Sequence, residues 1–276
     1  MADRRIDPVE RAHLRDAAGF SPPVHRFAPS PALTDLVRRY WMPVWAMPRG
    51  KSTTQRVLQY PVCLIVVANC YASFIGPTTG LATRTLSGQG WAFGAMLQPA
   101  AGALLLGASV SEITDAAIDF DQLPGLDGGA LTERVRSAVG DAPSEPARQA
   151  AAAAAVEDAL TEAPPVDEEG LLVNAVVEYV EDNSHVQRVG QICEKFAVSE
   201  RSLQRLTARR IGLSPKWLIQ RRRLHEAAAV LRTGKRRDLA RVAAELGYCD
   251  QAHFGRDFRT VTGLTPGEYA AEPRHS

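Results

Sequence analysis

Arginine and glutamine side chains recur at helical spacing in two stretches of the C-terminal part of the chain. In the first stretch Leu203 and Leu206 are expected to face a core, and in the second Phe254, Phe258 and Val261 take that place. The side chains left on the outer faces are Ser199, Arg201, Ser202, Gln204, Arg205 and Arg209 in the first stretch, and Gln251, Ala252, His253, Arg256 and Arg259 in the second. Because arginine and glutamine form paired hydrogen bonds with guanine and adenine edges, the pattern indicates contact with double-stranded DNA.

The charge distribution favours the same partner. The whole chain has a formal net charge of +1, but the segment 185–264 contains 17 basic and 7 acidic residues. Such an excess of positive charge attracts a polyanion, although a solvated helical surface can carry a similar excess. Arg221, Arg222 and Arg223 follow each other on a predicted helix, and we expect one or two of them to contact phosphate.

An internal repeat places the two polar faces in equivalent elements. Residues 189–217 resemble residues 239–268, at an offset of 50 residues before a turn and 51 residues after it. Ser199 and Asp250 are suited to cap the helix that follows each turn. This is the pattern of a helix–turn–helix, whose second helix enters the major groove. A single copy is equally compatible with an ordinary helix pair, whereas two copies in register favour DNA binding.

A linker helix is predicted between the two copies. Pro215 begins it, because proline is favoured in a first helical turn, and the helical pattern continues to about Arg232. Its length of about 25 Å follows from a rise of 1.5 Å per residue. Such a helix would hold two recognition helices about 34 Å apart, which is one turn of DNA.

Residues from about 170 to 270 resemble the DNA-binding domain of AraC/XylS-type bacterial transcription regulators. The resemblance rests on SERSLQRLTARRIGLSPKWL in the first copy and LARVAAELGYCDQAHFGRDFRTVTGLTPGEY in the second. It implies base-reading positions at Arg201, Gln204 and Arg205 in the first copy and at Ala252, His253 and Arg256 in the second. Two departures weaken the second recognition helix. Gly255 costs a helix about 1 kcal/mol relative to alanine, and Ala252 offers only apolar contact with a thymine methyl.

The residue pattern of the N-terminal half predicts an α+β domain, in which a small antiparallel β unit is followed by helices. Strand-like runs cover 38–47, 55–70, 71–76, 82–87 and 90–98, with glycine and proline between them. Helices are expected over 31–40, 101–117, 130–139 and 148–160, with Ser109 or Ser111 as a cap in the second of these. The segment Ala163-Pro164-Pro165 interrupts the pattern and marks a domain boundary.

The expected organisation is therefore a loose arm at 1–25, a sensor or regulatory domain over 26–163 and an all-α DNA-binding domain over 167–270. This last domain contains two helix–turn–helix motifs joined by a linker helix. It opens with an amphipathic helix whose apolar stripe consists of Leu171, Leu172, Ala175, Val176, Tyr179 and Val180. Because the proline segment has few apolar residues to bury, we expect a fragment from about residue 167 to be soluble and to bind DNA.

The stretch GWAFGAMLQPAAGALLLGASVSEITD resembles sensor domains fused to such regulators, which implies regulation without naming a ligand. Six aromatic residues lie in the predicted strands: Tyr40, Trp41, Trp45, Phe74, Trp91 and Phe93. We expect them to form core. The alternative is a small β-barrel whose aromatic lining holds an apolar molecule.

Catalytic and metal-binding patterns are missing from the sequence. The six histidines are far apart, and the four cysteines form no CxxC pair. There is no G-x-S-x-G, P-loop or dinucleotide-binding motif, so we expect no catalytic residue, metal or cofactor. His225 and His253 are expected at a helix surface and at the DNA, respectively. Cys63 and Cys70 are expected to be buried, with a redox sensor as the alternative.

The remaining features bear on location and function class. The longest apolar runs, 62–68 and 150–156, are far shorter than the roughly 20 residues of a membrane span, and we expect a cytoplasmic protein. The predicted function is DNA-binding transcription regulation, as activator or repressor, controlled by a small-molecule effector or a partner such as a second copy. The alternative is an effector-independent architectural protein whose N-terminal half only dimerises. An enzyme with a helix–turn–helix tail would need catalytic residues that the first half does not show.

Overall fold

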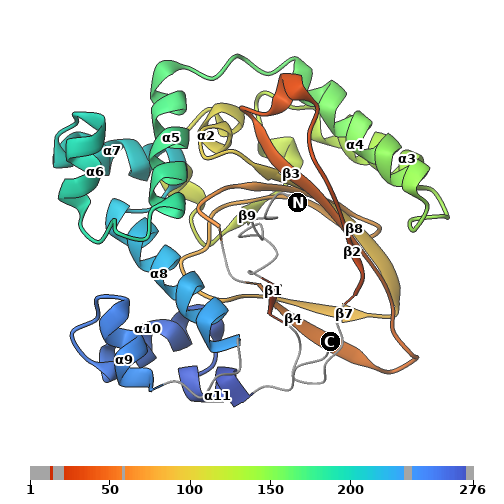
Figure 1. The fold of residues 1–276 in the computed structure, drawn as a ribbon. Helices are drawn as coiled ribbons and strands as arrows, with labels where there is room; N and C mark the ends of the chain where they lie inside the picture. Colours follow the sequence, from red (N-terminus) through yellow and green to blue (C-terminus); the bar gives the residue numbers. More distant parts are fainter. Residues whose placement is uncertain (1–12, 15–21, 58–59, 233–237, 272–276) are drawn as a thin grey trace, which may run out of the picture.

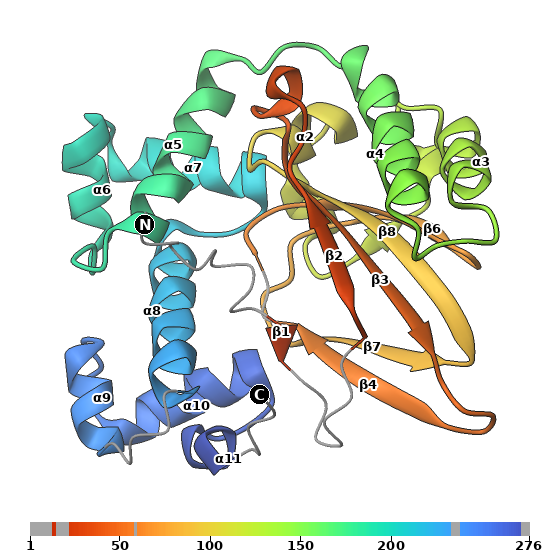
Figure 2. The same ribbon diagram turned by 45° about the vertical axis from the view of Figure 1, so that its right-hand side comes forward.

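The computed structural model describes residues 13–14, 22–57, 60–232 and 238–271. Strands dominate the first part of the chain, and helices dominate the part after Leu97. In Figures 1 and 2 the sheets lie on one side of the molecule, and the helices from α5 (Glu168–Asp182) onward lie on the other. The expected α+β part followed by an all-α part is therefore confirmed. Most of the predicted loose arm at 1–25 lies outside the described residues. Its residues 13–14 and 24–25 belong to strands, paired with residues 56–57 and 42–43, so the expectation of a loose arm is wrong for them.

The described strands of the N-terminal part form two antiparallel sheets. The larger sheet has the order β2 (Val24–Phe27), β3 (Val37–Ala46), β8 (Gln89–Leu97), β5 (Leu64–Ala68), β6 (Ala72–Ile75) and β9 (Ala117–Ile118). The smaller sheet has the order β1 (His13–Leu14), β4 (Ser52–Val57) and β7 (Ala82–Ser87). Four predicted runs correspond to β3, β6, β7 and β8, whereas the predicted run 55–70 contains the end of β4 and all of β5. The strands β1, β2 and β9 were not predicted.

The aromatic residues divide between the two faces of the larger sheet. Tyr40, Phe74 and Phe93 are fully buried in one core cluster, together with residues of α2 (Ala101–Leu106), α3 (Gly128–Val139) and α4 (Pro146–Thr161). On the other face, Trp41 lies opposite Gly94 and Trp45 opposite Gly90. A Cβ at either glycine would overlap the indole ring, so the two glycines let the tryptophans lie close against the sheet.

Two helix predictions in the N-terminal half are wrong. Instead of a helix over 31–40 there is a single 3₁₀ turn, η1 (Pro31–Leu33), and then β3. The β-branched and aromatic residues of that segment pair along β8, and this pairing overrides the local helical spacing. The helix expected over 101–117 ends at Gly107, which adopts a left-handed conformation. A 3₁₀ turn, η2 (Val110–Ile113), follows it, and Ser109 precedes that turn without a side-chain capping bond.

The described residues of the C-terminal part form seven helices. They are α5, α6 (Val189–Phe196), α7 (Glu200–Ile211), α8 (Pro215–Arg232), α9 (Leu239–Glu245), α10 (Gln251–Thr262) and α11 (Pro266–Ala271). In Figure 2, α8 runs between the α6–α7 pair above and the α9–α10 pair below. The helix over 215–232 is thus as predicted.

The buried face of α5 differs from the predicted stripe. Val176 and Val180 are buried as expected, but Val173 and Val177 are buried beside them, and Leu171 is 48% exposed. The apolar face is therefore rotated toward the valines. Within the described residues, no helix is both long enough and apolar enough to span a membrane.

Candidate nucleic-acid interface

The first helix–turn–helix is formed by α6 and α7. Ala197 ends α6 in a left-handed conformation, with φ of 52°, and Ser199 then caps α7 by accepting a hydrogen bond from the backbone N–H of Ser202 at 3.1 Å. Leu203 and Leu206 point inward and are buried in a cluster with Ile192. The capped turn and the apolar face together fix α7 against α6.

The outer face of α7 carries the side chains predicted for it. Arg201, Ser202, Gln204, Arg205 and Arg209 are all exposed. Gln204 donates a hydrogen bond from Nε2 to the Glu200 carboxylate at 3.1 Å. Glu200 is not among the predicted site residues, but it orients the Gln204 side chain. Glu200 lies four residues before Gln204, a spacing at which helical side chains meet.

The second helix–turn–helix is formed by α9 and α10. Gly247 makes the left-handed turn, with φ of 72°, and Asp250 caps α10 by accepting from the backbone N–H of His253 at 2.7 Å. Phe254 and Phe258 are fully buried, and Val261 is half-buried. The predicted outer residues are again exposed: Gln251, Ala252, His253, Arg256 and Arg259.

Asp257 orients part of the second recognition helix, although it is absent from the predicted set. Its carboxylate lies 3.5 Å from Nε2 of His253 and accepts a hydrogen bond from Nε2 of Gln220 on α8 at 2.5 Å. The spacing of four residues between His253 and Asp257 was a signal for this pair. Asp257 thus connects the exposed imidazole to the linker helix.

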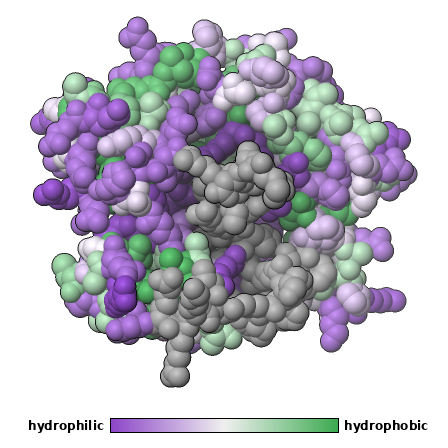
Figure 3. Space-filling model, viewed as in Figure 1, coloured by the Kyte–Doolittle hydropathy of each residue, from purple (hydrophilic) through white to green (hydrophobic). Residues whose placement is uncertain are grey.

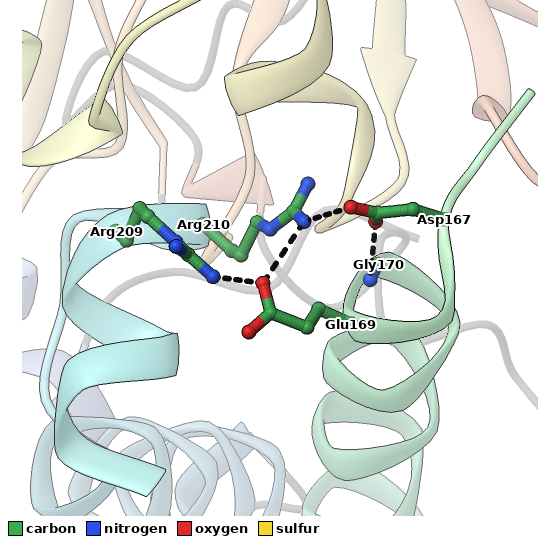
Figure 4. Close-up of polar contacts among 5 residues, drawn as sticks. All are labelled: Asp167, Glu169, Gly170, Arg209 and Arg210. Carbon is green, nitrogen blue, oxygen red and sulfur yellow. Dashed lines mark hydrogen bonds and ion pairs between the residues drawn. The ribbon is translucent and has the colours of Figure 1, made fainter. Parts of the chain in front are cut away.

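Arg209 reaches the edge of the site but is already paired. Figure 4 shows Arg209 and Arg210, at the end of α7, facing the acidic start of α5. Arg209 forms an ion pair with Glu169, and Arg210 pairs with Asp167 and, at 3.2 Å, with Glu169. The Arg210 guanidinium and the N–H of Gly170 hold the pKa of the Asp167 carboxyl below its ordinary value.

A small hollow of about 80 Å³ lies between Glu169 and the recognition face. It lies between α5 and α7, and its lining includes Glu169, Leu172, Ser202, Arg205 and Arg209. In Figure 3 the surface at the upper left, over α5 to α7, is mostly hydrophilic. The Glu169 carboxylate therefore shares one surface with the predicted DNA-reading arginines.

Phosphate contact was expected from one or two of Arg221, Arg222 and Arg223; burial excludes it for Arg221 and Arg222, and for Arg223 it stays a prediction. Arg221 and Arg222 are only 4% exposed. Arg221 pairs with Glu181 at 3.0 Å, while Arg222 pairs with Glu226 at 2.5 Å and donates to the carbonyl of Val186 at 2.7 Å. The half-buried Arg223 lies over the ring of Tyr248, 4.3 Å from its centroid. The three cations hold α8 to its neighbours.

The remaining candidate residues are a histidine and two cysteines. His225, expected at a helix surface, is instead buried and packs edge-on against Tyr60, because α8 is covered by the N-terminal part. Cys63 is buried as expected, and burial raises its pKa to about 12. Cys70 is exposed, so the expectation that it is buried is wrong. In the described part of the chain, no cluster of three or more histidine, cysteine or acidic residues is suited to hold a metal.

Two family models match the chain. Residues 192–272, which contain both recognition helices, match a helix–turn–helix domain. Residues 25–119, which contain most of the strands, match a domain of unknown function (DUF6597).

Curated relatives match over about a third of this chain. An uncharacterized HTH-type transcriptional regulator of Haemophilus influenzae is 30% identical over 95 residues, which are 34% of this chain and 30% of that protein. The F1 operon positive regulatory protein of Yersinia pestis is 30% identical over 105 residues, 37% of this chain and 35% of that protein. The chain therefore spans about a third of the length of these relatives.

Two similar solved structures cover different shares of this chain. A probable AraC family transcriptional regulator from Rhodopseudomonas palustris is 28% identical, with 37% of this chain and 99% of that chain covered and a TM-score of 0.34. ToxT from Vibrio cholerae is 9% identical, with 92% of this chain and 99% of that chain covered and a TM-score of 0.40.

Proposed function

We propose that this chain, whose C-terminal part is an AraC-type helix–turn–helix domain, is a sequence-specific DNA-binding transcription regulator. The observation that carries the proposal is the duplicated recognition helix. Both α7 and α10 are capped after a left-handed turn, bury one apolar face and expose a row of polar side chains. In this motif the second helix enters the major groove with its N-terminal residues against base edges.

The outward side chains suit different bases. The guanidinium groups of Arg201, Arg205 and Arg256 match the two acceptors of guanine, and the amide of Gln204 matches adenine. Ala252 offers contact with a thymine methyl. We therefore infer that the first copy contributes more hydrogen bonds to base edges than the second.

We infer that the N-terminal part controls DNA binding, in response to a small-molecule effector or to a partner such as a second copy. Support comes from its contacts with the helix–turn–helix part. Thr114 donates a hydrogen bond to the carbonyl of Gly212 at 3.0 Å, and Trp217 donates to the carbonyl of Thr79 at 3.3 Å. DNA affinity that changes with an added ligand would separate this proposal from an effector-independent architectural protein. The proposed role is one of binding in the cytoplasm and requires no catalysis.

The proposal is tested by measuring DNA affinity over a series of salt concentrations, with duplexes selected from random DNA and unrelated duplexes as the control. Log K should fall linearly with log salt, by about 0.9 for each phosphate that is neutralised. Arg209, Arg210, Arg221 and Arg222 are paired internally, so the slope should stay well below the value of about 9 that ten phosphates would give. An affinity that hardly changes with salt, or that is equal for all duplexes, would contradict the proposal.

A further inference from the structure

Glu181 lies where three parts of the molecule meet. It is near the end of α5, and its side chain is only 9% exposed. One carboxylate oxygen accepts from Nη2 of Arg38, on β3, at 2.6 Å, and the other accepts from Nη1 of Arg221, on α8, at 3.0 Å. One carboxylate therefore joins the N-terminal sheet, the first C-terminal helix and the linker helix.

An aromatic ring completes this cluster. The Arg221 guanidinium lies 4.2 Å from the centroid of the Tyr60 ring, and that of Arg38 lies 5.4 Å from it. Tyr60 belongs to the N-terminal part and is 4% exposed. Loss of one member from a buried charge cluster leaves an uncompensated charge behind, so these contacts resist separation of the two parts.

The linker helix α8 is shared by both helix–turn–helix copies. Its first half contributes Leu218 and Ile219 to the apolar cluster of the first copy. Its second half contributes Leu224 and Leu231 to the cluster of the second copy. Arg221 lies between the two halves, so a contact with Arg221 acts at the point where the two copies are joined.

The N-terminal part also touches the far end of each recognition helix. At the end of α7, a Cβ on Gly212 would lie 2.3 Å from Oγ1 of Thr114. At the end of α10, a Cβ on Gly263 would lie 2.8 Å from the Leu81 side chain. The apolar residues Val62 and Met96 pack in the cluster of the second copy. Both copies are thus held against one body.

We propose that Glu181 is a positioning residue for DNA recognition, which through Arg38 and Arg221 fixes the spacing between the two recognition helices. The inference rests on the proposed function, because it presumes that both helices bind one duplex. A DNA site would consist of two segments, one read by α7 and one read by α10. The N-terminal part would then select sites by the distance between these two segments. Movement of β3 against α5 would change that selection without altering any base-reading side chain.

The test compares full-length wild type with Arg38→Met, which leaves the Glu181–Arg221 pair in place. Duplexes carry the two segments that wild type selects, with one to three base pairs inserted or deleted between them. Each inserted base pair moves one segment about 3.4 Å along the duplex. Wild type should lose about tenfold or more in affinity when the spacing changes, as when one segment is mismatched. Arg38→Met should bind all spacings within about threefold of one another.

Three controls make the outcome decisive. Arg134→Met breaks an ion pair with Asp158 on the α3–α4 hairpin and should keep the wild-type spacing dependence. Thr114→Val removes the anchor at Gly212 and should relax the spacing dependence as Arg38→Met does. All variants should bind a duplex that carries only the first segment as wild type does.

Wild-type spacing dependence in Arg38→Met would overturn the inference, whatever the behaviour of Thr114→Val. Loss of single-segment binding in both would also overturn it, because the contacts would then serve folding rather than spacing. Failure of wild type to prefer any duplex would contradict the proposed function itself, which is a separate outcome.

Discussion

The arginines of the C-terminal part fall into two groups according to what lies beside them. Arg201, Arg205 and Arg256 are exposed on the outer faces of α7 and α10, whereas Arg221 and Arg222 are buried in ion pairs. The sequence predicts the first group, because helical spacing tells which side chains point outward. The partner of Arg221, Glu181, lies 40 residues away, and the sequence could not reveal that pair. The spacing of four residues between Arg222 and Glu226 was a signal for the other pair.

Arg209 is exposed like the first group and forms an ion pair like the second. Glu169→Gln should release Arg209 for phosphate contact and raise DNA affinity about two- to fivefold, in keeping with the small energy of exposed ion pairs. Affinity is measured at low salt for wild type, Glu169→Gln and Glu168→Gln. The last variant removes the same charge from the neighbouring position, which is exposed. Equal effects of the two substitutions would show that only net charge matters, and that the pair with Arg209 does not.

At the scale of elements, the caps and the repeat were the most informative signals. Ser199 and Asp250 cap α7 and α10 as predicted, and α8 begins at Pro215 as predicted. The failures lie where tertiary contacts decide the conformation. The segment 37–40 joins a strand because β8 offers partners to Val37, Arg39 and Tyr40, and periodicity within the segment does not contain that information.

Two glycines of the recognition helices should respond in opposite ways to alanine. Gly255 lies within α10, and a Cβ there would meet no atom within 4 Å, so Gly255→Ala should stabilise the protein by about 1 kcal/mol. Gly212 has φ of 66°, and a Cβ there would lie 3.0 Å or less from Val110 and Thr114 atoms, so Gly212→Ala should destabilise it by more than about 1 kcal/mol. Urea unfolding followed by circular dichroism measures both changes. A loss of stability in Gly255→Ala would refute the assignment of that position as unobstructed helix.

At the scale of the whole molecule, the contact between the two parts was not predictable. The residues that make it are ordinary in the sequence: Tyr60, Val62 and Met96 on one side, and Leu224 and Leu231 of α8 on the other. Their side chains meet only because strands from the first half and a helix from the second form one buried cluster. The proline segment at 163–165 does separate α4 from α5. The parts on its two sides nevertheless share a buried apolar cluster.

This shared cluster changes what is expected of a fragment that begins at residue 167. The fragment should still bind a single DNA segment, since α6, α7, α9 and α10 are all present. It should unfold at a lower temperature than the same helices in the full chain, because the face of α8 that packs against Tyr60, Val62 and Met96 is exposed to water. Thermal unfolding followed by helical circular dichroism tests this. A fragment as stable as the full chain would show that the contact contributes little.

The most direct test of the central claim, that each copy reads its own groove, is selection of preferred sites from random DNA at fixed salt. Wild type should protect about two helical turns, with contact regions roughly 34 Å apart. Arg205→Ala should lose about 1–3 kcal/mol and relax base preference only in the segment read by α7. Arg256→Ala should relax only the neighbouring segment, and more mildly, since Ala252 beside it forms no hydrogen bond. If both substitutions relax the same base pairs, or if neither changes preference, the two helices do not read separate grooves and the claim is wrong.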